Sequence, residues 1–257
     1  MSIFSLEGKK VIITGAGRGI GAELAKDFAR AGADLMLVSR TQSDLDKVAA
    51  EIKEFAPNQT VIGHACDVSD VDAVKAMVDE ADKQLGGIDV LVNNAGINKK
   101  MPFLDVDLDT WKNIININLN GQFIVAQTVA KKMADNGKGG SIVSMASVGG
   151  FIALQNTSPY CASKGGILQM VRVMASDLAP YGIRVNAICP GFIDTGLLEN
   201  NPQRDKLVEQ FKHSTPLGRV GNVRDLAGAA IFLASDASGY ITGTQITVDG
   251  GMSCVIS

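Results

Sequence analysis

Short apolar runs rich in β-branched residues alternate along the chain with longer segments of helical period. Seven such runs are predicted to be strands, and they lie at 10–14, 34–39, 60–65, 88–94, 141–147, 183–188 and 245–248. The segments between them carry apolar residues three and four positions apart, as amphipathic helices do. Because strand–helix alternation produces parallel strands joined by helical crossovers, the pattern predicts an α/β fold: a doubly wound parallel sheet of about seven strands with helices on both faces.

Length and composition limit the number of domains and the kinds of partner. The chain has 257 residues, 46% of them hydrophobic, and no Pro/Ser-rich linker, repeat or low-complexity tract, so we expect one domain over 1–257. A net charge of −3 favours neither nucleic acid nor an anionic membrane, and no apolar run approaches the ~20 residues of a membrane span. The opening MSIFSLEGKK lacks the apolar core of a secretory signal, which predicts a cytoplasmic protein.

Cysteines and histidines offer no sign of metal or hydrolase chemistry. The four cysteines are far apart and form no CxxC pair, so neither a disulfide framework nor a metal site is expected. His64 and His213 occur in no arrangement with an acid and a nucleophilic serine or cysteine. A hydrolase triad therefore has no support.

The stretch TGAGRGIG, from Thr14 to Gly21, follows the first predicted strand and opens the first predicted helix. Glycines in such a turn let the backbone approach a pyrophosphate, whose charge is stabilised by the N–H groups and dipole of the helix N-terminus. Gly15, Gly19 and Gly21 are spaced as GxxxGxG rather than GxGxxG, and a mobile turn is the alternative interpretation. The position between strand and helix favours the nucleotide-binding loop of a Rossmann-type domain.

The end of the second strand indicates which nicotinamide cofactor is bound. An NAD site places an acid there for the ribose hydroxyls, whereas an NADP site needs cations for the 2′-phosphate. This strand ends with Ser39 and Arg40, and Arg18 in the glycine-rich loop lies within reach of the same phosphate. The acids Asp44 and Asp46 fall in the following helix, so the sequence predicts NADP(H).

Four motifs together resemble the short-chain dehydrogenase/reductase family. They are TGAGRGIG, NNAG at 93–96, YCASK at 160–164 and PG at 190–191, and they occur in the order and at the spacing of that family. The resemblance extends from about Leu6 to Gly251, nearly the whole chain. It implies an oxidoreductase that interconverts a ketone and a secondary alcohol, and assembly into a homotetramer.

The resemblance assigns four catalytic residues, Asn118, Ser147, Tyr160 and Lys164. Tyr160 would donate and accept the proton, Ser147 would bind the substrate oxygen, and Asn118 would hold a water that connects Lys164 to solvent. Tyr160 and Lys164 stand four positions apart and share one helix face, although a solvated helix pair is the alternative interpretation. Lowering a tyrosine pKa from ~10 to ~7 requires roughly 4 kcal/mol, of which one cation at about 6 Å supplies about 2.8 kcal/mol at an effective dielectric of ~20. We expect the positively charged oxidised nicotinamide to supply the rest.

Further cofactor contacts are implied by the resemblance. The expected cofactor-binding residues, in chain order, are Gly15, Arg18, Gly19, Ile20, Gly21, Ser39, Arg40, Asp67, Val68, Asn94, Ala95, Gly96, Tyr160, Lys164, Pro190, Gly191, Ile193 and Thr195. For Asp67, which would lie beside the adenine, an acid at a helix N-terminus is the alternative, because a predicted helix follows directly.

The substrate is expected to contact segments outside this framework. Residues 192–220 break the strand–helix alternation and are polar, as in a mobile loop that covers a substrate. The segments STPLGRVG and GINKKMPF resemble polyol and keto-sugar-acid reductases, including gluconate 5-dehydrogenase-like members. Asn98, Lys99 and Lys100 follow the fourth strand at the carboxyl edge of the sheet, where two cations could hold a substrate carboxylate or phosphate. Solvated loop lysines are the alternative.

The sequence therefore predicts an NADP(H)-dependent oxidoreductase acting on CH–OH groups, with a polyol, keto-sugar or keto-sugar acid as substrate. A 3-oxoacyl-carrier-protein reductase is the alternative within the family, and a non-catalytic nucleotide-sensing protein is the alternative of another class. The helices expected at 111–133 and 160–178 carry more apolar positions than one buried stripe requires, which fits the homotetramer.

Overall fold

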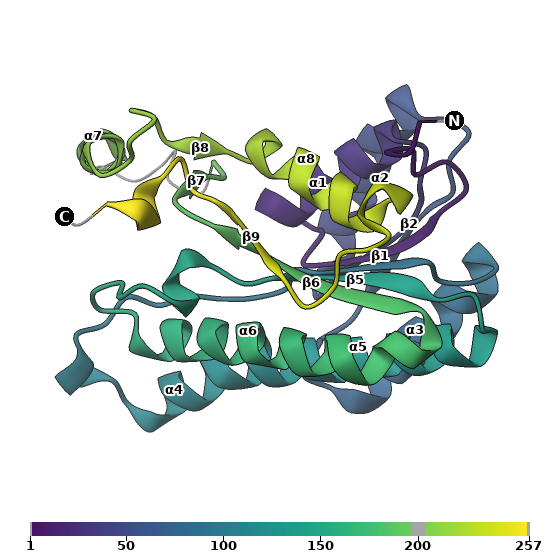
Figure 1. The fold of residues 1–257 in the computed structure, drawn as a ribbon, viewed down its shortest axis with the longest axis horizontal. Coiled ribbons are helices and arrows are strands. Elements are labelled where there is room, and N and C mark those ends of the chain that lie inside the picture. Colours follow the sequence, from purple (N-terminus) through teal and green to yellow (C-terminus); the bar gives the residue numbers. More distant parts are fainter. Residues whose placement is uncertain (1, 197–203, 256–257) are drawn as a thin grey trace.

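The computed structural model describes residues 2–196 and 204–255 and is built on a seven-stranded parallel sheet (Figure 1). The strands are β1 (Lys10–Thr14), β2 (Asp34–Ser39), β3 (Val61–Ala65), β4 (Val90–Asn93), β5 (Gly140–Met145), β6 (Ile183–Pro190) and β9 (Gln245–Val248). Their order across the sheet is β3-β2-β1-β4-β5-β6-β9. The predicted doubly wound fold is confirmed, and its strand order reverses between β1 and β4, where such sheets form a ligand-binding crevice.

Helices cover both faces of the sheet (Figure 1). One layer holds α1 (Gly19–Arg30), α2 (Gln42–Phe55) and α8 (Arg224–Ala234), and the other holds α3 (Val71–Leu85), α4 (Leu108–Ile115), α5 (Gly121–Asn136) and α6 (Ser158–Leu178). Short 3₁₀ turns occur at Phe103–Asp105, Val148–Gly150, Ala179–Tyr181, Asp236–Ser238 and Met252–Cys254. Within the described residues, no helix has the length and apolar character needed to cross a membrane.

The strands β1 to β6 supply side chains to two hydrophobic cores, one beneath each helical layer, whereas the edge strand β9 contributes to one of them. In β1, Val11 and Ile13 belong to the core under α1, α2 and α8, whereas Ile12 belongs to the core under α3, α5 and α6. All three side chains are fully buried. Burial on both faces explains why the strands appear in the sequence as continuous apolar runs.

Tertiary pairing moves some strand ends from the predicted positions. The strand expected over 183–188 continues to Pro190, because Cys189 and Pro190 pair with β9. β4 and β5 end earlier than the predicted runs at 88–94 and 141–147, at Asn93 and Met145. The residues that follow each of these strands are thereby free to line the carboxyl edge of the sheet.

The predicted substrate-covering loop at 192–220 contains regular structure. β7 (Ile193–Asp194) pairs in parallel with β8 (Gly221–Asn222), and α7 (Arg204–His213) lies between them in the chain. Phe192 stacks on Phe211 of α7 with 3.6 Å between ring centroids. Residues 197–203 of the predicted loop lie outside the described residues.

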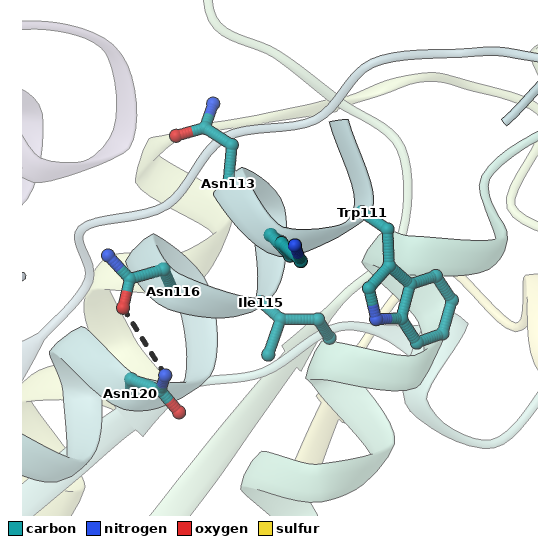
Figure 2. Close-up of a pocket in the computed structure, with 6 residues that line it drawn as sticks. Trp111, Asn113, Ile115, Asn116 and Asn120 are labelled. Atoms are coloured by element: carbon teal, nitrogen blue, oxygen red, sulfur yellow. Dashed lines mark hydrogen bonds between the residues drawn. The ribbon is translucent and has the colours of Figure 1, made fainter. Parts of the chain in front are cut away.

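A π-helical turn at Asn116–Asn120 joins α4 to α5. Figure 2 shows the outer side of this junction, where Asn120 Nδ2 donates to Asn116 Oδ1 across the turn at 3.3 Å. A shallow groove of about 430 Å³ lies here, and it is lined by Trp111, Lys112, Asn113, Ile115, Asn116 and Asn120.

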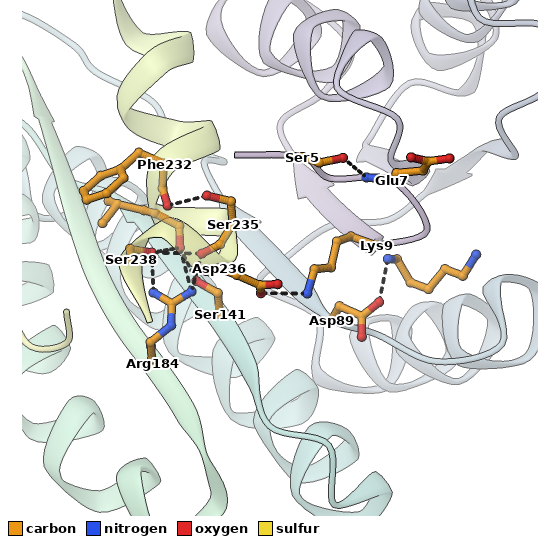
Figure 3. Close-up of polar contacts among 12 residues, drawn as sticks. Ser5, Glu7, Lys9, Asp89, Ser141, Arg184, Phe232, Ser235, Asp236 and Ser238 are labelled. Atoms are coloured by element: carbon orange, nitrogen blue, oxygen red, sulfur yellow. Dashed lines mark hydrogen bonds and ion pairs between the residues drawn. The ribbon is translucent and has the colours of Figure 1, made fainter. Parts of the chain in front are cut away.

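The amino edge of the sheet is fixed by polar contacts (Figure 3). Arg184 at the start of β6 donates to the Leu233 and Ser235 carbonyls at the end of α8 and to Ser238 Oγ. Because the last carbonyls of a helix have no partner within it, the guanidinium satisfies the C-terminus of α8. This edge is structural, and the opposite edge remains open for a ligand.

Candidate active site

A cleft of about 710 Å³ lies at the carboxyl ends of the strands. Its lining includes most of the residues predicted to bind a cofactor or to act in catalysis. The predicted residues that line it are Gly15, Arg18, Gly19, Ile20, Ser39, Arg40, Asp67, Val68, Asn94, Ala95, Gly96, Asn98, Ser147, Tyr160, Lys164, Pro190, Gly191, Ile193 and Thr195. The lining residues that the sequence did not point to are Gly17, Thr41, Asp44, Cys66, Ile97, Ile117, Met145, Ala146 and Phe192.

The glycine-rich loop wraps closely around the N-terminus of α1. Gly15 and Gly19 have φ of +67° and +58°, a region that residues with a Cβ rarely adopt. A Cβ on Gly21 would lie 2.2 Å from the Gly15 carbonyl oxygen, so this helix position requires glycine although Gly21 itself does not line the cleft. With no acidic side chain in its first turn, α1 presents unpaired N–H groups to the cleft, as an anion such as a pyrophosphate requires.

Thr14 ties this loop to the NNAG segment after β4. Its Oγ1 accepts hydrogen bonds from the backbone N–H of Asn94 at 2.9 Å and of Ala95 at 3.0 Å, and donates to Asn93 Oδ1. Asn94 Nδ2 donates in return to the Thr14 carbonyl at 2.9 Å. The two strand ends on either side of the crevice are therefore held as one unit.

The segment after β6 closes the far side of the cleft. A Cβ on Gly191 would lie 2.6 Å from Asp249 Cβ, so the chain passes here against the segment that follows β9. Thr195 reaches the glycine-rich loop, since its Cβ lies 3.6 Å from the Cβ position of Gly19. The cleft is thus bounded at both ends by backbone that admits a long, flat ligand such as a dinucleotide.

Asp67 and the two predicted arginines line the cleft from the loops that follow β3, β1 and β2. Asp67 accepts hydrogen bonds from the Ser69 N–H and Oγ, which lower its pKa, and Arg40 adds to this lowering. The N-cap of α3 is Asp70, not Asp67. Within the described parts of the chain, neither Arg18 nor Arg40 has an ion-pair partner, so both guanidinium groups are available to a ligand.

Ser147, Tyr160 and Lys164 meet in the centre of the cleft. Burial raises the pKa of Tyr160, and a hydrogen bond with the Ser147 side chain opposes that rise. Lys164 Nζ lies 5.6 Å from the centre of the Tyr160 ring. The direction differs from the lowering we expected Lys164 to cause, because burial outweighs the other influences on the phenol.

Lys164 is buried and bound to the end of β5. Its Nζ donates to the Met145 carbonyl at 2.6 Å, and Gln122 Nε2 donates to the same oxygen at 3.3 Å. The loss of solvent lowers the pKa of Lys164 from 10.5 to about 8. A buried ammonium held by a single carbonyl is poised to exchange that partner for another acceptor in the cleft.

Asn118 does not line the cleft but is buried behind it in the π-helical turn. Its Oδ1 accepts from the Ile97 N–H at 2.8 Å, and its Nδ2 donates to the Ile97 carbonyl and to Ser163 Oγ. A Cβ on Gly96 would lie 3.3 Å from Asn118 Oδ1 and 3.7 Å from Lys164 Nζ, so the two residues are neighbours. The side chain is therefore used to hold the chain after β4 beside Lys164.

The three residues predicted to contact substrate separate in the structure. Asn98 lines the cleft. Lys99 Nζ instead donates to Thr110 Oγ1 at 3.2 Å, in the first turn of α4, and Lys100 is exposed. The geometry thus brings only Asn98 to the cleft wall.

A doubly wound sheet whose carboxyl edge combines a glycine-rich phosphate loop with a serine, a tyrosine and a buried lysine defines a nucleotide-dependent oxidoreductase. Residues 15–253 match a family model described as enoyl-(acyl carrier protein) reductase. The chain belongs to the short-chain dehydrogenase/reductase family, whose named members among its relatives are dehydrogenases and reductases acting on CH–OH groups.

Relatives of this chain include sugar-acid dehydrogenases and an acyl-carrier-protein reductase. Gluconate 5-dehydrogenase from Gluconobacter oxydans is 36% identical over 98% of this chain and 97% of its own. A 3-oxoacyl-[acyl-carrier-protein] reductase from Thermotoga maritima is 39% identical over 96% of this chain and 98% of its own. The crystal structure of a gluconate 5-dehydrogenase from Burkholderia cenocepacia in complex with NADP and tartrate superimposes with a TM-score of 0.92, at 36% identity and 98% coverage of both chains.

Proposed function

We propose that this enzyme uses NADP(H) to interconvert a ketone and a secondary alcohol on a polyol, keto-sugar or keto-sugar acid. The observation that carries the proposal is the meeting of Ser147, Tyr160 and Lys164 in the cleft that the glycine-rich loop opens. A nucleotide-sensing protein without catalysis is the alternative from another class, and it would have no use for a buried lysine beside a tyrosine.

Tyr160 is the group that moves the proton. Because burial raises its pKa, the phenol is protonated at neutral pH and is suited to donate to the oxygen of a ketone. The Ser147 hydroxyl, already within hydrogen-bond reach of Tyr160, would bind the same oxygen and orient the carbonyl. A nicotinamide held in the cleft would supply the hydride for reduction, and Tyr160 would take up the proton in the reverse reaction, where the positive charge of the oxidised ring would favour the ionised phenol.

Lys164 and Asn118 act behind the tyrosine. Lys164 would exchange the Met145 carbonyl for the ribose hydroxyls of the cofactor, which its single hydrogen bond permits. Asn118 would fix this arrangement through Ile97 and, as predicted from the family, take part in a water path from Lys164 to solvent. Both are proposed catalytic assignments.

The cofactor would extend from the arginine pair to the nicotinamide contacts after β6. Arg18, Ser39 and Arg40 would bind the 2′-phosphate, because two uncommitted guanidiniums and a hydroxyl suit a dianion. The pyrophosphate would lie on the N-terminus of α1, Asp67 and Val68 beside the adenine, and Pro190, Gly191, Ile193 and Thr195 around the nicotinamide. The bound NADP of the Burkholderia cenocepacia neighbour supports this choice.

The substrate class is supported by the sugar-acid relatives and by the polar wall at Asn98. A 3-oxoacyl-carrier-protein reductase is the second candidate, favoured by the Thermotoga maritima relative. Lys99 and Lys100 remain predicted carboxylate ligands, but Lys99 must first leave Thr110.

The test is NADPH consumption with three kinds of substrate: a keto-sugar acid, its uncharged keto-sugar analogue and a 3-oxoacyl thioester. We expect the acid to have the highest kcat/KM, and Lys99→Ala/Lys100→Ala to raise its KM while hardly changing that of the neutral analogue. Preference for the thioester would select the second candidate. Equal effects of the double substitution on KM for the acid and for the neutral analogue would show that the two lysines do not bind the carboxylate.

We further propose a homotetramer that covers the outer face of α4, α5 and α6. Large apolar side chains are exposed there, including Leu104 (94% exposed), Leu108, Trp111 and Phe123. Trp111 lines the groove at the α4–α5 junction (Figure 2). Isolated exposed apolar residues are common on monomers, whereas several large ones on neighbouring elements indicate a contact surface. A second copy of the chain is the proposed occupant, as the family resemblance implies.

A further inference from the structure

Asp44 lies in the cleft although the sequence places it inside α2. It belongs to the first turn of that helix, whose N-cap is Thr41, and it lines the cleft together with Arg18, Ser39 and Arg40. The sequence predicted that no carboxylate would oppose the 2′-phosphate of NADP. The structure instead places Asp44 in the wall of the cleft.

Packing around Gly17 fixes the position of this acid. A Cβ on Gly17 would meet Ser39 Oγ at 2.9 Å and Asp44 Cβ at 3.0 Å. Both side chains therefore flank the same point of the glycine-rich loop. These two distances place Ser39 Oγ within about 6 Å of Asp44 Cβ, so a phosphate that accepts a hydrogen bond from Ser39 Oγ would approach a side chain of like charge.

The Asp44 carboxylate has no other evident task. In the described part of the chain it forms no hydrogen bond and no ion pair, although two guanidiniums line the same cleft. It does not close a capping box, because the Thr41 N–H donates to Ser39 Oγ. A favourable interaction with the dipole of α2 is the purely structural role left to it.

We infer that Asp44 is a specificity-determining residue that limits the preference for NADP(H) and gives NAD(H) access to the same site. Its carboxylate repels the 2′-phosphate that Arg18 and Arg40 attract, and it accepts a hydrogen bond from the free 2′-hydroxyl of NAD(H), the role an acid plays in NAD sites. The inference rests on the proposed use of NADP(H), and it adds that the two cofactors differ only modestly in efficiency.

The direct test is calorimetric binding of 2′,5′-ADP and 5′-AMP, which differ by the 2′-phosphate and need no turnover. Asp44→Asn should strengthen binding of 2′,5′-ADP by about threefold to tenfold, as expected for an exposed charge, and leave 5′-AMP unchanged or weaker. The same substitution should raise the ratio of kcat/KM for NADPH over NADH by a similar factor. The gain should shrink as salt is added.

Asp46→Asn is the matched control. It removes the same charge from the same helix, but Asp46 does not line the cleft and its carboxylate accepts from Gln42 Nε2. We expect it to change neither fragment's affinity. Equal changes in both variants, or an unchanged ratio of fragment affinities in Asp44→Asn, would overturn the inference while leaving the proposed reductase intact. If the unsubstituted protein binds neither fragment, the proposed cofactor and this inference are both overturned.

Discussion

Among the single residues of the site, Lys164 lowers the folding stability of the protein at neutral pH because its charge is buried. Lys164 is 4% exposed, and burial lowers its pKa to about 8. In the unfolded chain the same group has a pKa of ~10.4. Between these values the unfolded chain binds more protons, so the contribution of this group to folding stability rises with pH from about 8 to about 10.5 and is most unfavourable below that range.

Lys164→Met should therefore make the folded protein more stable at neutral pH. The expected gain in the free energy of unfolding is about 1 kcal/mol at pH 7, since removal of a buried charge is partly offset by the lost hydrogen bond to Met145. The gain should disappear as the pH approaches 10 and the wild-type lysine becomes neutral. Urea unfolding at both pH values checks this, and a destabilised variant at pH 7 would contradict it.

Ser39→Asp with Arg40→Leu should reverse the cofactor preference. The pair places an acid against the adenosine ribose and removes one cation from the 2′-phosphate. We expect kcat/KM with NADH to exceed that with NADPH in the variant and to fall below it in the wild type. Steady-state kinetics with both cofactors measure the ratio of the two kcat/KM values. Identical ratios in the two proteins would show that Ser39 and Arg40 do not determine the cofactor preference.

At the scale of elements, the start of α1 depends on close backbone packing. Gly21→Ala places a Cβ 2.2 Å from the Gly15 carbonyl oxygen, so the loop must move. We expect a loss of about 2 kcal/mol in the free energy of unfolding and weaker dinucleotide binding. Gly228→Ala in α8 is the control, because its Cβ meets no atom within 4 Å and the change should stabilise the helix by up to ~1 kcal/mol.

The elements differ in how far the sequence predicts them. β1, β2 and β9 have the bounds that the sequence predicts. For β1 and β2 the reason is that parallel strands buried on both faces need continuous apolar runs. The π-helical turn before α5 was not predicted, since it depends on hydrogen bonds between Asn118 and the distant Ile97. β7 and β8, of two residues each, are too short to leave a pattern.

The residues of the candidate site also differ in how far the sequence predicts them. Residues from each of the four motifs line one cleft, although Gly21 of the first motif and the predicted catalytic Asn118 do not. The sequence did not predict that Asp44 lines the cleft, because a position in a helix does not by itself show which way the side chain faces. That direction depends on packing against Gly17 and Ser39. Lys99 was placed on the correct edge of the sheet, yet its partner Thr110 belongs to the next helix.

At the level of the complete protein, the exposed apolar side chains near α4 predict assembly with further copies of the chain. We expect light scattering at micromolar concentration to give the mass of a tetramer. Leu104→Asp/Leu108→Asp should shift the protein towards smaller species, because two exposed apolar side chains become charged in the proposed contact. An unchanged circular dichroism spectrum is the control for folding. A monomeric wild type would rule out the proposed assembly.

The role of Tyr160 as proton donor is tested by Tyr160→Phe, with NADPH binding and turnover measured on the same preparation. The ring would still pack beside Lys164, so the dissociation constant for NADPH should change by less than about twofold. kcat should fall by about a thousandfold, within the range for loss of a general acid. Tyr181→Phe, at an exposed tyrosine, should match the wild type in both measurements. If Tyr160→Phe keeps more than about a tenth of the wild-type rate, equivalent to ~1.4 kcal/mol of barrier, Tyr160 is not the proton donor.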